Sequence, residues 1–191
     1  GGVNVNNPNR DVQHSTEYSL GYERQVGSSA SLSADYIRIN GDDLLMTLNL
    51  TPGLRDTTVS TSTLRRINPN FSAAVSELVN TGETTYDALQ LSFDKRFSHD
   101  FSTRVSYTLA KGRGNTAANG ASGSLFQLLT DMRLDLNEGP TDFDRRHNFV
   151  VSGSAIVPKT GGLTVSWVAR ALSALPFTIF NSTIDQERNA Q

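Results

Sequence analysis

Alternation of apolar and polar residues near the start of the chain predicts a β-hairpin. Over residues 16–26, tyrosine, leucine and valine occupy even positions, whereas glutamate, serine and glutamine occupy odd positions. The same period of two continues over residues 30–36, after the link Gly27-Ser28-Ser29. Successive side chains of a strand point to opposite faces, so each predicted strand has an apolar and a polar face. A three-residue link of this composition predicts a tight hairpin.

A second hairpin is predicted by the alternation of residues 89–97 and 101–109, which flank the turn Ser98-His99-Asp100. If Phe97 pairs with Phe101 and no bulge intervenes, the register follows from the numbering alone. That register places the following residues opposite one another: Phe93 and Val105, Leu91 and Tyr107, and Asp94 and Arg104. The last pair would form a cross-strand ion pair on the polar face.

A third hairpin is predicted from about residue 149 to residue 171, around the turn sequence PKTGG at residues 158–162. Pairing Val157 with Leu163 would set Trp167 beside Gly153. An aromatic ring at that position would cover the strand where the glycine has no side chain. The second face of the return strand, which includes Val168, is less cleanly polar than in the other hairpins.

Two long connections, residues 40–84 and 111–147, separate the three hairpins. Connections of this length are uncommon in compact domains, and the alternation of short and long links is typical of outer-membrane barrels. Helical spacing within them predicts short helical segments over two sets of residues: Leu125, Leu128, Leu129 and Met132, and Phe71, Ala74, Val75 and Leu78.

The pattern as a whole predicts an all-β fold, an antiparallel up-and-down meander of about six strands with long extracellular loops. Transmembrane barrels need at least about eight strands to close, so this meander is expected to be a segment of a larger transmembrane β-barrel. The start of the chain lacks an export signal and its last residues are polar rather than a finishing aromatic strand. Residues 1–191 are therefore expected to be a partial barrel domain, truncated at both ends.

Composition narrows the possible functions. With 17 lysine and arginine residues against 19 aspartate and glutamate residues, the net charge is −2, which argues against nucleic acid as a partner because phosphate binding needs an excess of basic residues. The chain has no cysteine, which excludes thiolate catalysis and cysteine-bound zinc. It also has no run of 18 apolar residues that would form a transmembrane helix.

Three blocks of the sequence carry a family resemblance: YSLGYERQVGSSASLSADYIRINGDDL, TTYDALQLSFDKRFSHDFSTRVSYTLAKG and GPTDFDRRHNFVVSG. They resemble the barrel region of TonB-dependent outer-membrane receptors of the Oar-like type, over roughly Glu17 to Thr178. The resemblance implies a barrel of about twenty-two strands closed by an N-terminal plug, which takes up a scarce ligand with energy supplied through TonB. It also implies that the stretch NPNFSAAVSELV is extended rather than helical, and we favour the extended form.

The barrel interpretation predicts that one face of the meander lines the aqueous lumen and that the other face contacts lipid. The charged residues expected to face the lumen are Glu17, Glu23, Asp35, Asp94, Arg96 and Arg104. The residues expected to face lipid are Tyr18, Leu20, Tyr22, Leu32, Tyr36, Leu91, Phe93, Phe97, Phe101, Val105, Tyr107, Leu109, Phe149, Val151 and Trp167. A soluble sandwich would bury the second set as its core instead, and alternation alone does not separate these two cases.

The densest ionisable cluster comprises Asp142, Asp144, Arg145, Arg146 and His147. Carboxylates near a histidine could bind a metal or perform acid-base chemistry, but opposite charges at this spacing favour structural ion pairing. Asp42 and Asp43 could supply oxygen ligands to calcium, although the rest of a calcium loop is absent, so a turn with solvated carboxylates is favoured. His14 and His99 are isolated in sequence and are expected to be ordinary exposed residues.

Other motifs of known chemistry are weak or missing. The stretch GRGNTAANGASGS lacks the Gly-Lys-Ser/Thr ending of a phosphate-binding loop, which favours a surface loop. There is no GxSxG motif that would mark a hydrolase nucleophile. No catalytic residue, cofactor or metal is therefore predicted.

The sequence thus predicts a barrel segment of a receptor in the bacterial cell outer membrane, with no enzymatic activity. Its expected partners are outer-membrane lipid, an unknown extracellular ligand and the TonB energy-coupling complex, the last through a plug outside this chain. One alternative is a soluble secreted β-sandwich that binds glycans or proteins. Another is a hydrolase centred on the ionisable cluster of residues 142–147.

Overall fold

The computed structural model describes residues 2–51, 53–54, 65–66, 68–116 and 137–177. Ten strands are formed, and they account for most of the described chain. Their bounds are β1 (Val3–Asn6), β2 (His14–Val26), β3 (Ala30–Asn49), β4 (Gly53–Leu54), β5 (Arg65–Arg66), β6 (Val75–Ser98), β7 (Phe101–Gly114), β8 (Gly139–Pro140), β9 (His147–Ile156) and β10 (Thr164–Leu172).

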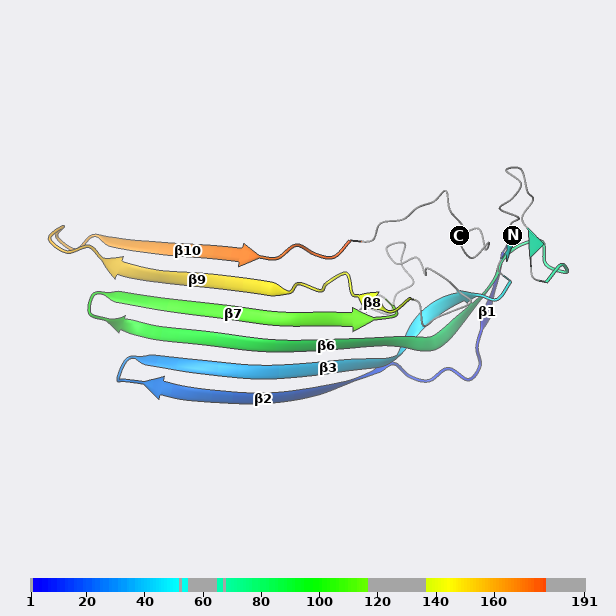
Figure 1. Ribbon diagram of the computed structural model, residues 1–191, viewed down its shortest axis with the longest axis horizontal. Helices are drawn as coiled ribbons and strands as arrows, with labels where there is room; N and C mark the ends of the chain where they lie inside the picture. Colours follow the sequence, from blue (N-terminus) through cyan, green and yellow to red (C-terminus); the bar gives the residue numbers. More distant parts are fainter. Residues whose placement is uncertain (1, 52, 55–64, 67, 117–136, 178–191) are drawn as a thin grey trace.

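Six long strands form one antiparallel sheet in the order β10-β9-β7-β6-β3-β2 (Figure 1). The sheet is all-β and follows the chain as a meander, which confirms the predicted fold class. At one end, here named the turn end, three short links join β2 to β3, β6 to β7 and β9 to β10. At the other, the loop end, β1 pairs in parallel with β6, and β8 pairs with β7.

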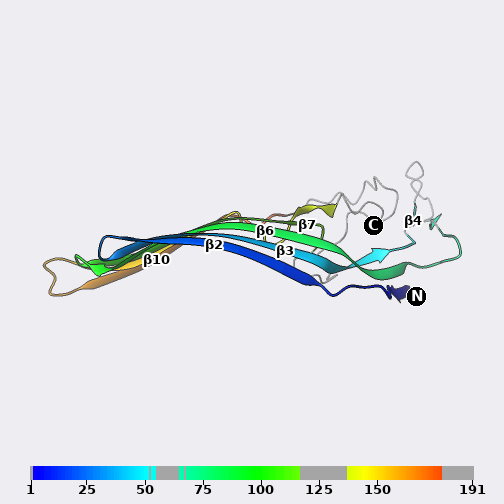
Figure 2. The ribbon, with the colours of Figure 1, turned by 90° about the horizontal axis from the view of Figure 1, so that it is seen from below.

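Seen from its edge, the long sheet is a single twisted layer (Figure 2). β4 and β5 form a separate two-stranded sheet, and β4 lies beyond the loop end of the long strands. Within the described ranges, no second sheet covers either face of the long strands, so these residues do not form a sandwich.

The first hairpin forms as predicted, and Val26 lies opposite Ala30 across the link Gly27-Ser28-Ser29. In the second hairpin, the predicted pairing of Phe97 with Phe101 is wrong, because Ser98 pairs with Phe101. His99 and Asp100 form a two-residue turn with positive φ angles of 52° and 63°, the backbone that a type I′ hairpin turn requires.

A β-bulge between Lys95 and Ser98 compensates for the shorter turn. The three predicted pairs therefore remain correct: Phe93 with Val105, Leu91 with Tyr107, and Asp94 with Arg104. The bulge also fastens two hairpins together. The backbone N–H of Arg96 donates to the carbonyl of Ser29 at 2.8 Å, and its guanidinium donates to the carbonyl of Ser28 at 2.8 Å.

The third hairpin is confirmed, with Trp167 directly opposite Gly153. Its turn begins at a hydrogen bond from the N–H of Val157 to the carbonyl of Leu163, at 2.7 Å. A Cβ added to Gly153 would lie 2.5 Å from Trp167 Cζ2 and 2.6 Å from the Ser102 carbonyl oxygen. The indole ring therefore occupies the space that a side chain at this position would need.

The two predicted loops are shorter than expected, because β3 continues to Asn49, β6 begins at Val75 and β7 continues to Gly114. Residues 41–49 were missed because two register shifts, from Gly41 to Leu44 and from Leu44 to Met46, break the alternation there. Val75 and Leu78 lie in β6, so the extended interpretation is confirmed for the second part of that stretch, whereas residues 68–74 belong to neither a strand nor a helix. The helix predicted from Leu125, Leu128, Leu129 and Met132 lies outside the described residues.

The small buried core lies toward the loop end. Met46, Val75 and Val79 are buried where β3 and β6 extend beyond the other long strands. Ala88 and Ala110, which pair across β6 and β7, are also buried. Most large apolar side chains of the sheet remain exposed instead, so hydrophobic burial within the described chain does not explain its amphipathic pattern.

Candidate functional site

One face of the sheet is apolar across all six long strands. Residues directly opposite on neighbouring strands share a face, so the register can be followed from strand to strand. One such row runs through Tyr22, Ala34, Leu91, Tyr107, Phe149 and Ala171. The adjacent row on the same face contains Leu32, Phe93, Val105, Val151 and Ala169. These rows and those flanking them, with Tyr18, Leu20, Tyr36, Leu89, Leu109, Phe101 and Trp167, form what we call the apolar face.

The apolar face is exposed although it carries the largest side chains. Leu20 is 77% exposed and Tyr22 is 65% exposed, and large apolar residues of all six long strands are exposed. Water-soluble monomers rarely expose a contiguous apolar surface of such extent. The chemistry of this face therefore requires an apolar environment outside the described chain.

The opposite face, here named the polar face, carries five of the six charged residues that the sequence predicted to share one side. They are Glu17, Glu23, Asp35, Asp94 and Arg104. Between them lie many serines, some joined by hydroxyl hydrogen bonds: Ser33 with Ser92 at 2.7 Å and Ser102 with Ser154 at 3.0 Å. These small hydroxyl side chains keep the polar face hydrophilic.

Alternation does not assign Arg96 and Phe97 to a face, because both lie in the bulge between Lys95 and Ser98. The guanidinium of Arg96 is committed to the carbonyl of Ser28 in the neighbouring turn. Arg96 therefore contacts the turn between β2 and β3. The spacing of residues along β6 alone could not predict this contact.

Asp94 and Arg104 form the expected cross-strand ion pair, in which Arg104 Nε donates to Asp94 Oδ1. Their side chains are 36% and 71% exposed, so water screens the attraction and the pair should contribute at most about 1 kcal/mol.

The double variant Asp94→Arg with Arg104→Asp is expected to fold into membranes as well as the wild type. The measurement is the fraction of protein that runs as the folded band in gel electrophoresis without heating.

Each single variant, Asp94→Arg or Arg104→Asp, places two like charges opposite each other and should be slightly less stable than the double exchange. Loss of folding in the double exchange, with both single variants tolerated, would show that the two side chains do not act as a pair.

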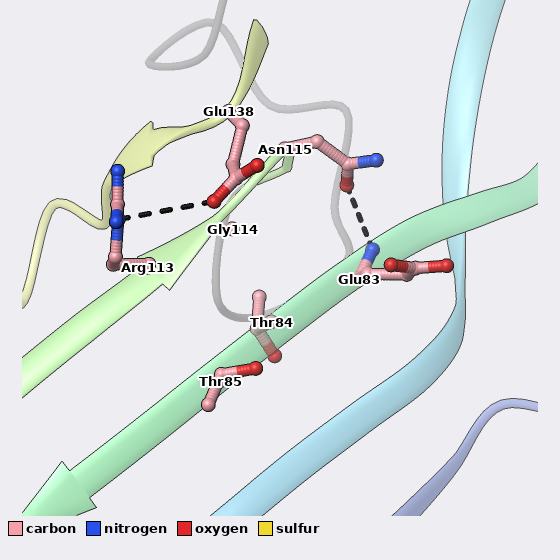
Figure 3. A pocket seen from close by; sticks show the side chains of 7 residues that line it. All are labelled: Glu83, Thr84, Thr85, Arg113, Gly114, Asn115 and Glu138. Atoms are coloured by element: carbon pink, nitrogen blue, oxygen red, sulfur yellow. Dashed lines mark hydrogen bonds and ion pairs between the residues drawn. The ribbon is translucent and has the colours of Figure 1, made fainter. Parts of the chain in front are cut away.

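A polar pocket of about 310 Å³ lies at the loop end, between β6, β7 and β8 (Figure 3). Its lining residues are Glu83, Thr84, Thr85, Arg113, Gly114, Asn115 and Glu138. Arg113 Nε lies 3.8 Å from Glu138 Oε1 across the β7–β8 pairing. Hydroxyl, carboxylate and guanidinium groups thus converge on one pocket, a set that can hydrogen-bond a polar ligand.

The amide of Asn115 holds the pocket wall in place. Its Oδ1 accepts a hydrogen bond from the N–H of Glu83 at 2.7 Å, and its Nδ2 donates to the carbonyl of Thr81 at 3.0 Å. Sequence reasoning missed this pocket because Glu138 reaches it only through the pairing of β8 with β7. Asn115 belongs to the glycine-rich stretch that the sequence identified only as a surface loop.

The ionisable cluster of residues 142–147 has a different geometry from the one expected. Only His147 belongs to a strand, so strand spacing does not apply to the other four residues. Asp144 Oδ1 accepts the N–H of Gly112 at 2.9 Å, and Arg145 donates to the carbonyl of Ser173 at 2.8 Å. His147 Nδ1 lies 2.7 Å from the hydroxyl of Tyr107.

Among these five described residues, no ion pair joins two members: Asp142, Asp144, Arg145, Arg146 and His147. Asp144 and Arg145 instead bind backbone groups of β7 and of the segment after β10. These hydrogen bonds thus fix the chain where it enters β9, and they do not assemble carboxylates around the histidine.

His14 is not isolated in the fold. Its Nδ1 lies 3.2 Å from Asp43 and its Nε2 lies 3.7 Å from Asp42. Asp43 has a φ of 56° at the first irregularity of β3, so the two aspartates belong to a bulged strand rather than to the expected turn. In the parts of the chain that the structure describes, no three His, Asp or Glu side chains are placed to hold a metal ion.

Among the described residues, no helix is long and apolar enough to cross a membrane. A family model described as an outer membrane beta barrel domain matches residues 1–187. No curated protein sequence matches the chain. Its fold is similar to the crystal structure of the outer membrane transporter YddB from Escherichia coli, with a TM-score of 0.59 and 13% sequence identity. The match covers 98% of this chain and 24% of the transporter chain.

Proposed function

Because the chain belongs to the outer membrane beta barrel domain family, we propose that its sheet forms part of the wall of a receptor that imports a ligand across the outer membrane. The observation that carries this proposal is the exposed apolar face opposite a hydrophilic one. In a barrel wall, lipid would cover the apolar face and the aqueous lumen would wet the polar face. Each face of the sheet would then contact an environment of matching polarity.

The extent of the apolar face along the strands supports the same assignment. On β6, its apolar residues lie between Asp87 and Lys95. A tilted strand needs about 9–11 residues to cross the hydrocarbon layer, which is close to this interval. The charged groups at its two ends would then reach the two membrane interfaces. Further strands of the complete protein would pair with the open edges of β2 and β10 and close the barrel.

In this arrangement the turn end faces the periplasm and the loop end faces the outside, because outer-membrane barrels have short periplasmic turns and longer extracellular loops. The polar pocket around Arg113 and Glu138 would then meet ligand at the outer rim. The charges of the polar face, including Asp94 and Arg104, would set the potential of the lumen. Energy for uptake would come from the TonB complex, acting through a plug that other parts of the protein supply.

The proposed orientation can be tested with single cysteines, because this chain has none of its own. Asn9→Cys at the loop end should react with a membrane-impermeant maleimide on intact cells that express the complete protein. Ser28→Cys, in the turn between β2 and β3, should react only after the outer membrane is permeabilised. The measurement is the fraction of each variant that is labelled under the two conditions.

Labelling of both cysteines on intact cells would overturn the proposed orientation, as would labelling of Ser28→Cys alone. TonB coupling is tested on the same cells by co-purification of the complete protein with TonB. Recovery of TonB with the receptor is expected, and its absence after cross-linking would contradict energised uptake while leaving the barrel wall in place.

A further inference from the structure

A charged row crosses the apolar face near the loop end. Arg38 on β3 is directly opposite Asp87 on β6, which is directly opposite Lys111 on β7. All three residues share the apolar face with Tyr36, Leu89 and Leu109, which form the next row toward the turn end. Charges on this face need an explanation, because charged side chains are costly on a surface that meets lipid.

The charges of this row are not balanced internally. Arg38 Nη1 lies 3.6 Å from Asp87 Oδ1, and the same oxygen accepts a hydrogen bond from the hydroxyl of Tyr36 at 2.6 Å. The ammonium of Lys111 is exposed and has no hydrogen-bond or ion-pair partner among the described residues. Two cations therefore flank one carboxylate, and the row has a net charge of about +1.

The opposite boundary of the apolar face is arranged differently. The ammonium of Lys95 donates to the carbonyl of Ser98 at 2.6 Å and to the carbonyl of Phe101 at 2.9 Å, and it lies over the Phe101 ring. The contacts of the Lys95 ammonium are thus made within the β6–β7 hairpin. Arg24 is opposite Leu32 and has no second cation in its row.

We propose that Arg38 and Lys111 bind a phosphate group of an anionic lipid in the outer leaflet, while the acyl chains of that lipid lie against Leu89 and Leu109. This inference rests on the proposed function, which places the apolar face in the membrane and the loop end outside. Guanidinium and ammonium groups are the usual protein ligands of phosphate. A phosphate at the membrane interface would supply the negative charge that this row lacks, directly above an apolar surface that fits acyl chains.

The test is lipid retention by the complete protein. Wild-type protein and the double variant Arg38→Gln with Lys111→Gln are reconstituted with lipid A and phosphatidylcholine, extracted in mild detergent and examined by native mass spectrometry. We expect lipid A on the wild type and a fall of about fivefold or more in the double variant. Arg24→Gln, which removes one cation from the same face at the turn end, is the matched control and should retain wild-type levels.

Equal lipid A on the double variant and the wild type would overturn the proposal, as would an equal loss in the Arg24→Gln control. Excess inorganic phosphate should not displace the lipid; complete displacement would show that the row binds soluble phosphate instead. Folding of each variant is checked by the heat-dependent shift of its band in gel electrophoresis, and Lys111→Gln alone serves if the double variant does not fold. If the wild type does not insert into vesicles at all, the proposed function fails rather than the lipid site.

Discussion

Leu91→Arg is expected to lower the free energy of unfolding in a bilayer by about 2–4 kcal/mol. Leu91 lies midway between Asp87 and Lys95 on β6, on the apolar face, opposite Ala34 and Tyr107. At this depth an arginine would have to leave its charge in hydrocarbon or pull water and headgroups inward. The measurement is the unfolding midpoint of the complete protein in liposomes, followed by tryptophan fluorescence against denaturant.

The matched control is Gln90→Arg, one position earlier on the same strand. Gln90 belongs to the polar face, opposite Asp35 and Thr108, so the new charge would meet water and the nearby Asp35 carboxylate. Its effect should stay within about 0.5 kcal/mol, as for most surface substitutions. Equal effects of the two substitutions would contradict the assignment of lipid to the apolar face, and a larger effect of Gln90→Arg would reverse it.

Gly153→Ala is expected to cost about 1–3 kcal/mol, the usual range for forcing an extra methyl group into a packed site. The new Cβ would lie 2.5 Å from the indole of Trp167 and 2.6 Å from the carbonyl oxygen of Ser102. The indole can rotate away, but the Ser102 carbonyl belongs to β7, which pairs with β9 at this point. The strands must therefore separate slightly, which a denaturant unfolding curve of the folded protein would record.

Gly139→Ala provides the control, because a Cβ at Gly139 would have no heavy atom within 4 Å; its expected cost is within about 0.5 kcal/mol. The contribution of the indole is isolated by Trp167→Ala. The double variant Gly153→Ala with Trp167→Ala should lose less stability than the sum of the two single variants, because removing the ring relieves one of the two clashes. Strict additivity would show that the indole does not limit the space at Gly153.

Much of the sheet is predictable from local pattern. Period-two alternation identifies the central parts of β2, β3, β6, β7, β9 and β10, because one face of each strand meets an apolar environment. The same pattern gives the pairing of Asp94 with Arg104 and of Trp167 with Gly153. In both cases a short turn leaves few alternative registers, so spacing along the chain determines which residues meet across strands.

The pattern fails where the backbone departs from regular pleating. Because of the bulge after Lys95, alternation does not predict the faces of Arg96 and Phe97. For the same reason, the sequence pattern does not predict the two-residue turn of His99 and Asp100. The irregularities around Leu44 hide the outer part of β3. In a bulge, two residues oppose one on the partner strand, so a single inserted residue reverses the parity of everything beyond it.

The fold class, the three hairpins and the division of side chains between an apolar and a polar face follow from local pattern, because each depends on neighbours in one strand or across one short turn. The folded sheet was needed to show which residues far apart in the chain lie together. It placed Glu138 beside Arg113 and Arg38 opposite Asp87. These contacts join strands separated by long connections, and the register across such connections is set by the packing of the whole sheet rather than by spacing along the chain.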